Sequence, residues 1–294
     1  MTEDEYGAYH ALIETDDDQR WAFGTGFTDA LAGVDTTVPE GIDRQALAAY
    51  CLMLGDDALI YSHRLQQWIT RAPELEEETA LANVALDLLG QARMLLARAG
   101  RADGTDRDED SLAFFRDKHE FRNVRLVERL DADFAELVAR LLIFASFRLA
   151  LFEVVRAAAD PVLAAIAAKG VNELSYHRDY AAQWVVRLGD GTDLSRQRMQ
   201  AGLDVIWPVV DELFLRHPVE AALPGVAPDV RELRAEVDVV LDTVLATAGL
   251  QRPTTRPLAS VRGRAGRDGV HTEALGYVLA EMQSVARAHP DATW

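Results

Sequence analysis

Residues 55–100 read GDDALIYSHRLQQWITRAPELEEETALANVALDLLGQARMLLARAG. Apolar residues recur every three or four positions in this stretch, which is the spacing of a helix with one buried face. Pro73 divides the stretch, and the glutamates that follow it suit the positive N-terminal end of a second helix. Both predicted helices carry carboxylates among apolar residues. The stretch therefore predicts two long helices with acidic side chains inside the protein.

The same helical spacing continues almost to the end of the chain, with no strand pattern and no internal repeat. Four long helices in two antiparallel pairs, with a long connection between the pairs, predict an all-α fold: a four-helix bundle with additional C-terminal helices over residues 43–294. The long helices are expected at 43–71, 73–99, 133–158 and 161–188, and the shorter ones at 111–118, 192–215, 229–248 and 271–288.

Residues 1–42 differ from the rest of the chain in composition. They are acidic and contain scattered glycines, which favours a mobile N-terminal extension. Trp21, Phe23 and Phe27 favour the other interpretation, in which this segment docks on the main body or on a partner. Composition leaves both interpretations open.

Charge and cysteine content limit the classes of function. The chain has 294 residues, with 48 acidic and 30 basic side chains and a net charge of −18, which excludes nucleic acid and anionic membranes as partners. Cys51 is the single cysteine, so no internal disulfide forms and a reducing compartment fits. The first ten residues lack the basic-then-apolar order of a signal peptide, and no run of about 18 apolar residues suggests a membrane span. We expect a cytoplasmic protein.

Acidic residues inside a helical bundle raise the question of a di-iron centre. Such a centre takes one carboxylate from each of two helices and a Glu-x-x-His pair from each of the other two. No glutamate in this sequence is followed by histidine three residues later. Both histidines of the template are therefore missing, and the residues point to no catalytic or cofactor-binding side chain.

Four side chains are candidates for a degenerate metal site: Asp57, Asp87, Glu173 and His177. Each also has a structural interpretation. Asp57 would be a buried aspartate bonded to an arginine, and Asp87 would lie in a polar seam or on a partly exposed helix face. Glu173 would pair with His177 on a helix surface. Because an unpaired charge in a core is costly, buried carboxylates need cations. The candidate cations are Arg64, Arg93, Arg148 and Lys169.

One segment is basic in this acidic chain. The arginines in residues 251–269 suit contact with an acidic partner, with coenzyme A phosphates or with the protein's own acids, and contact with protein is favoured. Nearby, Asp268 and His271 form the single Asp-x-x-His, for which helix capping is favoured over metal binding. The five arginines are Arg252, Arg256, Arg262, Arg264 and Arg267.

Long collinear stretches over residues 50–294 resemble the structural C subunits of bacterial phenylacetyl-CoA epoxidases, the PaaC family. The matching stretches are residues 55–58 (GDDA), 72–77 (APELEE), 81–93 (LANVALDLLGQAR), 107–114 (RDEDSLAF), 121–123 (FRN), 164–169 (AAIAAK), 176–177 (YH), 183–192 (QWVVRLGDGT) and 266–277 (GRDGVHTEALGY).

The resemblance implies a ferritin-like fold and a place in a multicomponent monooxygenase that epoxidises the aromatic ring of phenylacetyl-CoA with O2 and NADPH. It also implies the partners: a catalytic A subunit with the di-iron centre, a small B subunit, and a reductase with flavin and an iron–sulfur cluster. This chain would be a non-catalytic structural subunit without a cofactor. The alternatives are a di-iron or di-manganese carboxylate oxygenase with an altered ligand set and a free-standing helical scaffold.

Overall fold

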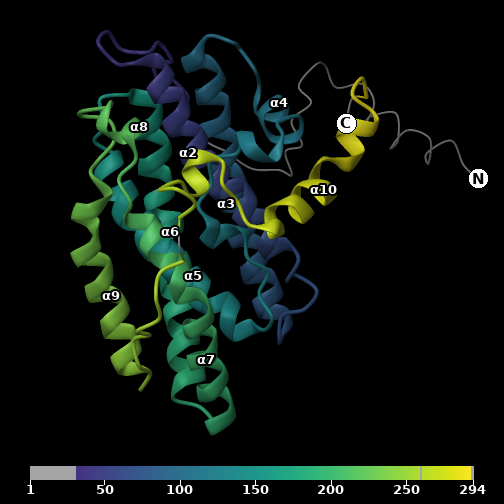
Figure 1. The fold of residues 1–294 in the computed structure, drawn as a ribbon, viewed down its shortest axis with the longest axis vertical. Helices are drawn as coiled ribbons and strands as arrows, with labels where there is room; N and C mark the ends of the chain where they lie inside the picture. Colours follow the sequence, from purple (N-terminus) through teal and green to yellow (C-terminus); the bar gives the residue numbers. More distant parts are fainter. Residues whose placement is uncertain (1–30, 259, 293–294) are drawn as a thin grey trace, which may run out of the picture. The chain divides into compact units, whose positions relative to one another are not determined.

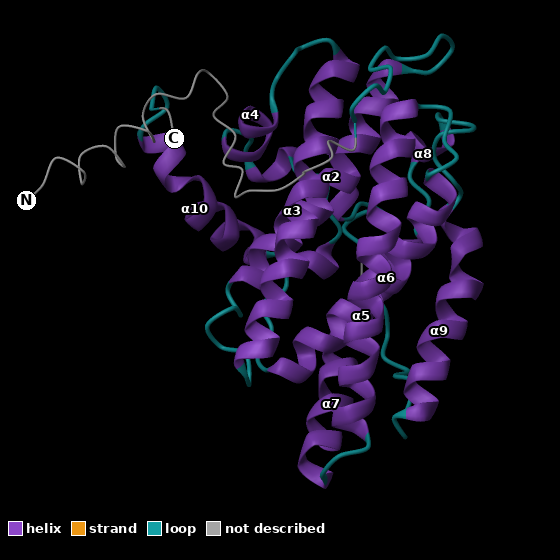
Figure 2. Ribbon diagram, turned by 180° about the vertical axis from the view of Figure 1, so that it is seen from behind, coloured by secondary structure: helices purple, strands orange, loops and turns teal. Residues whose placement is uncertain are grey.

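The computed structural model describes residues 31–258 and 260–292, and its contacts group residues 33–294 into one compact unit. Within this unit, four long helices lie side by side (Figures 1 and 2). Helix α2 packs along α3, α5 packs along α6, and α3 contacts α6. This arrangement confirms the predicted all-α bundle. The four helices are α2 (Arg44–Gln66), α3 (Leu75–Asp103), α5 (Phe134–Val155) and α6 (Pro161–Gly189).

Shorter elements follow and flank the bundle. Helices α7 and α9 pack on α5 and α6, whereas α8 and α10 contact α2. No strand occurs in the described ranges. The helices are α4 (Glu109–Phe114), α7 (Asp193–Ile206), α8 (Pro218–Ala221), α9 (Arg234–Thr247) and α10 (Glu273–Ala288). The 3-10 turns are η1 (Lys118–Glu120), η2 (Arg125–Glu128), η3 (Trp207–Phe214), η4 (Val230–Leu233) and η5 (Gly266–Asp268).

Local sequence explains where the elements begin and end. The Asp160 side chain accepts a hydrogen bond from the backbone of Leu163, and Pro161 occupies the first turn, so α6 begins where a cap and a proline meet. The single helix expected over 192–215 is instead divided into α7 and η3 near Pro208, which has no N–H to donate to an α-helical ladder.

Burial differs sharply between the helices. In α5, 18 of 22 residues are buried, because the bundle covers one side and α7 and α9 cover others. In α3, 12 of 29 residues are buried. Helix α3 is also the one described helix that is long and apolar enough to cross a membrane. It packs along α2, so its apolar residues serve the core of the bundle.

The predicted extension over residues 1–42 is described only from residue 31, so Trp21, Phe23 and Phe27 lie outside the described residues. Residues 33–42 belong to the same compact unit as the bundle. There, the Thr36 carbonyl accepts a hydrogen bond from the buried guanidinium of Arg98 on α3 at 2.5 Å.

Candidate functional site

Arg148 lies in the interior of the bundle, in the middle of α5. Residues 141–150 of this helix contain no carboxylate. The Nε of Arg148 donates to Gln91 Oε1 of α3 at 2.9 Å, and its Nη1 donates to the Leu54 carbonyl of α2 at 3.2 Å. The side chain is buried, and its guanidinium lies over the Phe152 ring at 4.5 Å. Burial lowers the pKa of Arg148 to about 10, so it remains a cation at neutral pH.

Asp57 is held by a second arginine. Its Oδ2 accepts a hydrogen bond from Arg267 Nη2 at 2.7 Å, and its Oδ1 accepts one from the Val124 backbone at 2.8 Å. Burial disfavours the charge on Arg267, but the adjacent Asp57 carboxylate outweighs it and raises the pKa of Arg267. The expected buried aspartate–arginine pair therefore exists. Its cation is Arg267 and none of the four proposed candidates.

The other two carboxylates have separate partners. Glu173 accepts a hydrogen bond from Gln91 Nε2 at 2.9 Å and forms an ion pair with Lys169 one turn earlier on α6. His177 is buried, and its Nε2 lies 3.0 Å from Oδ2 of Asp87, whose side chain is 36% exposed. His177 thus pairs with Asp87 across α3 and α6, and the expected pairing with Glu173 is not formed.

The four candidates do not meet in one cluster. Asp57 faces Arg267, Glu173 faces Lys169 and Gln91, and Asp87 faces His177. In the part of the chain that the structure describes, no three His, Cys, Asp or Glu side chains are grouped so that they could hold a metal ion. The bundle interior is instead a set of ion pairs and hydrogen bonds around Arg148.

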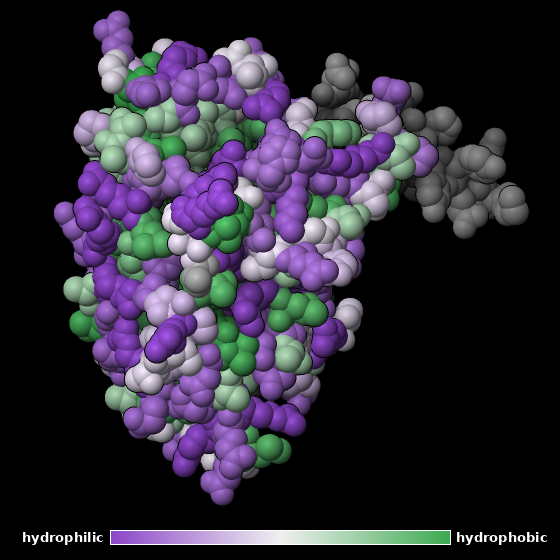
Figure 3. Space-filling view, in the orientation of Figure 1, coloured by the Kyte–Doolittle hydropathy of each residue, from purple (hydrophilic) through white to green (hydrophobic). Residues whose placement is uncertain are grey.

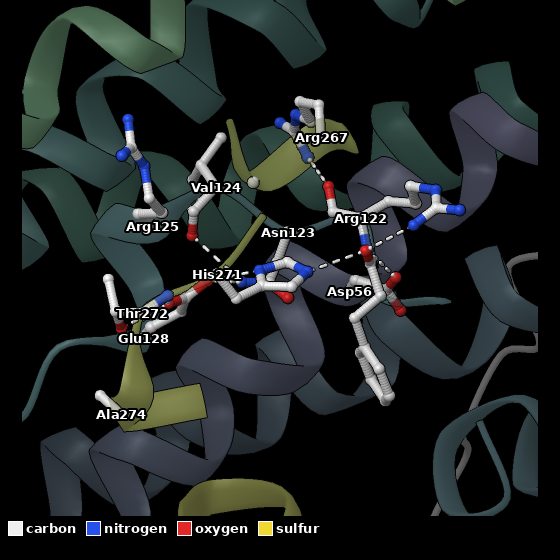
Figure 4. A network of polar contacts seen from close by, with 12 residues as sticks. Asp56, Arg122, Asn123, Val124, Arg125, Glu128, Arg267, His271, Thr272 and Ala274 are labelled. Atoms are coloured by element: carbon white, nitrogen blue, oxygen red, sulfur yellow. Dashed lines mark hydrogen bonds and ion pairs between the residues drawn. The ribbon is translucent and has the colours of Figure 1, made fainter. Parts of the chain in front are cut away.

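A second buried network joins the segment before α10 to the bundle (Figure 4). Glu128 is fully buried, and its Oε1 accepts hydrogen bonds from Asn123 Nδ2 at 3.0 Å and from His271 Nδ1 at 2.6 Å. Its Oε2 accepts two more, from the Thr272 backbone at 2.7 Å and the Thr272 hydroxyl at 2.6 Å. The other ring nitrogen of His271 lies 3.0 Å from the Phe121 carbonyl. Both ring nitrogens therefore face acceptors, which suits the imidazolium.

We call residues 265–272 the clasp, because they hold the 116–128 connection against α2. Arg267 reaches the carbonyls of Met53 at 2.7 Å and Arg122 at 2.9 Å in addition to Asp57. Gly269 has φ 76°, and a Cβ there would lie 2.2 Å from the His119 carbonyl, so the turn requires glycine. Of the two residues expected to cap a helix, Asp268 accepts a hydrogen bond from the Ala265 backbone at 3.0 Å at the start of η5. The His271 ring bonds Glu128 instead.

The five arginines of residues 251–269 separate into two groups. Arg267 is inside the clasp, and Arg252 pairs with Asp238 and with Asp242 at 2.6 Å on α9. The other three, Arg256, Arg262 and Arg264, are exposed. Two of the five therefore pair with the protein's own acids, and a contact with a partner stays a prediction for the exposed three.

Asp131 provides a test of the buried ion pairs by pH. Burial raises its pKa to about 6, although its ion pair with Arg140 opposes the rise. Because the folded pKa lies above the unfolded value, the stability from this group is fully present below pH 4. It is lost as the pH rises through 6. We expect the free energy of unfolding of wild type, relative to Asp131→Asn, to fall by up to about 1.4 kcal/mol per pH unit between pH 4 and 6. Urea denaturation of both proteins at four pH values measures this, and parallel curves would contradict it.

Comparison with known proteins agrees with this architecture. The family described as Phenylacetic acid catabolic protein matches residues 33–294, which is the whole unit that contains the bundle. This chain belongs to that family. Among curated proteins, it is similar to the C subunit of 1,2-phenylacetyl-CoA epoxidase from Escherichia coli (strain K12), with 42% identity over 250 residues. The alignment covers 84% of this chain and 99% of that protein.

The family membership confirms the resemblance drawn from the sequence, and the bundle is ferritin-like, as in this family. Sequence reasoning missed Glu128 and the role of His271, as well as Arg267 as the cation beside Asp57. One signal was present: the stretch GRDGVH at 266–271 lies within a segment that resembles the family. In the structure, this stretch is most of the clasp.

Proposed function

We propose that this chain is the non-catalytic C subunit of a multicomponent phenylacetyl-CoA 1,2-epoxidase, which acts in aerobic phenylacetate breakdown in the cytoplasm. In this proposal, it pairs with the catalytic A subunit and stabilises it. The similarity to the Escherichia coli protein along 99% of that protein's length supports this assignment.

The position of Arg148 inside the bundle is the main support for a non-catalytic role. A dinuclear centre would place two metal cations among the four long helices, with ligands from each of them. Helix α5 instead contributes a guanidinium there, bound to α2 and α3. A fixed positive charge in a medium of low dielectric constant repels further cations strongly. The charge of Arg148 therefore supports the proposal that this chain has the fold of a di-iron protein but does not bind the metal pair.

The redox groups of the reaction then belong to other chains. We propose that the A subunit holds the di-iron centre and the substrate, and that a reductase supplies electrons through flavin and an iron–sulfur cluster. The assembly also includes a small B subunit. The contribution of this chain is a rigid partner surface, which is supported by the paired charges throughout its interior.

The experiment is metal analysis of this chain, expressed alone and with the A subunit, both in medium supplied with ferrous iron. We expect a stable complex in which iron follows the A subunit, and far less than one iron per chain in the isolated protein. About two irons per isolated chain, with oxidase or oxygenase activity that Asp87→Ala abolishes, would establish the alternative of a di-iron or di-manganese oxygenase. A monodisperse chain that never co-purifies with the A subunit would indicate a free-standing scaffold.

A further inference from the structure

A loop between α9 and α10 carries positive charge that the described chain does not neutralise. Arg256 and Arg262 are exposed and form no ion pair with any acidic residue in the described ranges. Arg264 is also exposed, and its Nη2 donates only to the Asp268 carbonyl, at 2.7 Å. With the two apolar side chains between them, these residues form what we call the arginine loop: Arg256, Leu258, Val261, Arg262 and Arg264.

The backbone holds the arginine loop in a defined shape. Leu258 donates its N–H to the Pro208 carbonyl at 2.6 Å, and Val261 and Arg264 exchange two backbone hydrogen bonds of 2.9 and 3.1 Å. Arg262 and Gly263 between them have φ of 55° and 79°, the combination of a type I′ turn. A left-handed arginine is uncommon, and such residues persist where the surrounding structure holds them. Arg262 is thus presented at the tip of a tight turn.

Exposed apolar side chains accompany the charges. Leu258 is 45% exposed and Val261 is 57% exposed. Figure 1 shows this segment running from the end of α9 past α5 towards α10, and Figure 3 shows hydrophilic side chains lying directly beside hydrophobic ones on the same face. Arginine is enriched at protein interfaces, and hot-spot residues there are surrounded by contacts that exclude water. The loop has this composition.

Charge determines the chemistry of the partner. The chain as a whole carries −18, so its field repels nucleic acid and anionic membranes. A local group of unpaired arginines is complementary to an acidic protein surface. Without these arginines, the net negative charge of the chain would repel such a surface. The neighbouring Arg252 already bonds Asp238 and Asp242 of this chain, which shows the same recognition within the fold.

We propose that the arginine loop docks on an acidic surface, with an apolar centre, on the catalytic A subunit of the epoxidase. This inference rests on the proposed function. The arginines steer the encounter and fix its register, while Leu258 and Val261 are buried when the subunits meet.

The test measures binding of the full-length chain to the purified A subunit by biolayer interferometry at several NaCl concentrations. Arg256→Glu/Arg262→Glu is compared with Arg101→Glu/Arg198→Glu, a control with the same charge change at two exposed arginines of α3 and α7. We expect the loop variant to associate about tenfold more slowly at low salt and to lose most of its salt dependence. The control should stay within about threefold of wild type. Leu258→Ser/Val261→Ser should instead speed dissociation.

Other outcomes would overturn the proposal. Equal association rates for the loop variant and the control would remove the loop from the interface. Calorimetric binding of coenzyme A to the isolated wild type, lost in Arg256→Glu/Arg262→Glu, would assign the arginines to phosphate. Self-association of the isolated chain that only the loop variant abolishes, measured by light scattering, would make the partner a second copy. A wild type that binds no subunit refutes the proposed function instead, so the two failures are distinguishable.

Discussion

Replacement of Arg267 by methionine is expected to lower the free energy of unfolding by about 3–5 kcal/mol, because it leaves a buried carboxylate without its cation. In the folded protein, Arg267 donates to Asp57 and to two backbone carbonyls, and Asp57 is 1% exposed. The Val124 N–H would be the single remaining donor in the described contacts of Asp57. Urea denaturation at pH 7 measures the loss.

A matched control and a double variant separate charge from packing. Arg262→Met makes the same chemical change five residues earlier at an exposed side chain, so we expect a change within about 0.5 kcal/mol. Asp57→Leu/Arg267→Met removes both charges, and we expect it to recover much of the stability lost in Arg267→Met, since apolar replacements of buried ion pairs are often neutral. A double variant as unstable as the sum of the two single variants would contradict a direct coupling of the pair.

Replacement of Glu128 by alanine should have an effect of similar size. Four donors converge on this carboxylate, including both the side chain and the backbone of Thr272. Without it, four donors in a buried site lose their shared acceptor, and the loss is expected to reach about 3–5 kcal/mol. The clasp would also detach from the 116–128 connection, so proteolysis between α9 and α10 should be faster.

Glu128→Gln and Glu136→Ala serve as the comparisons for this variant. Glu128→Gln keeps the shape of the side chain but replaces one acceptor with a donor, so we expect an intermediate loss of stability. Glu136 accepts a backbone hydrogen bond from Ala132 at the start of α5 and touches no residue of the clasp in the described contacts. Cleavage rates equal in Glu128→Ala and Glu136→Ala would show that Glu128 does not anchor the clasp.

The helices could be predicted from the sequence because their signals are local. Apolar periodicity and the Asp160–Pro161 pair fixed the start of α6 to the residue, and the bundle followed from four such segments. The errors lie where local signals compete. Helix α2 ends at Gln66 rather than at 71, since residues 67–74 form turns and bends between α2 and α3. The apolar periodicity predicted one helix over 192–215, which the structure divides into α7 and η3 near Pro208.

The sequence predicted that Asp57 would pair with an arginine, but it did not predict which arginine. An aspartate on an apolar helix face needs a cation, and this argument correctly gave Asp57 an arginine. It could not say which arginine, because a single sequence carries no information on pairing across 210 positions. Glu128 was missed for a related reason. It lies in a connection with no periodic pattern, and its four donors come from residues that only the fold assembles.

The arginines of 251–269 show the limit of composition. They look alike in the sequence, where five cations in nineteen residues suggest one basic surface. In the structure, Arg267 points into the protein. Arg252 pairs with two aspartates of α9 and lies over the Trp207 ring at 5.1 Å. Burial, which no count of charges reveals, separates the structural arginines from those free to meet a partner.

The distance along the chain between Asp57 and Arg267 also has a consequence during synthesis. Helix α2 is among the first elements to leave the ribosome, whereas its counter-charge is translated 210 residues later. A nascent chain that already holds all four long helices still carries the Asp57 carboxylate without its cation. Products that stop before residue 272 are therefore expected to stay loose at that end and to be recognised by proteases, so that only chains translated beyond this segment become competent to assemble.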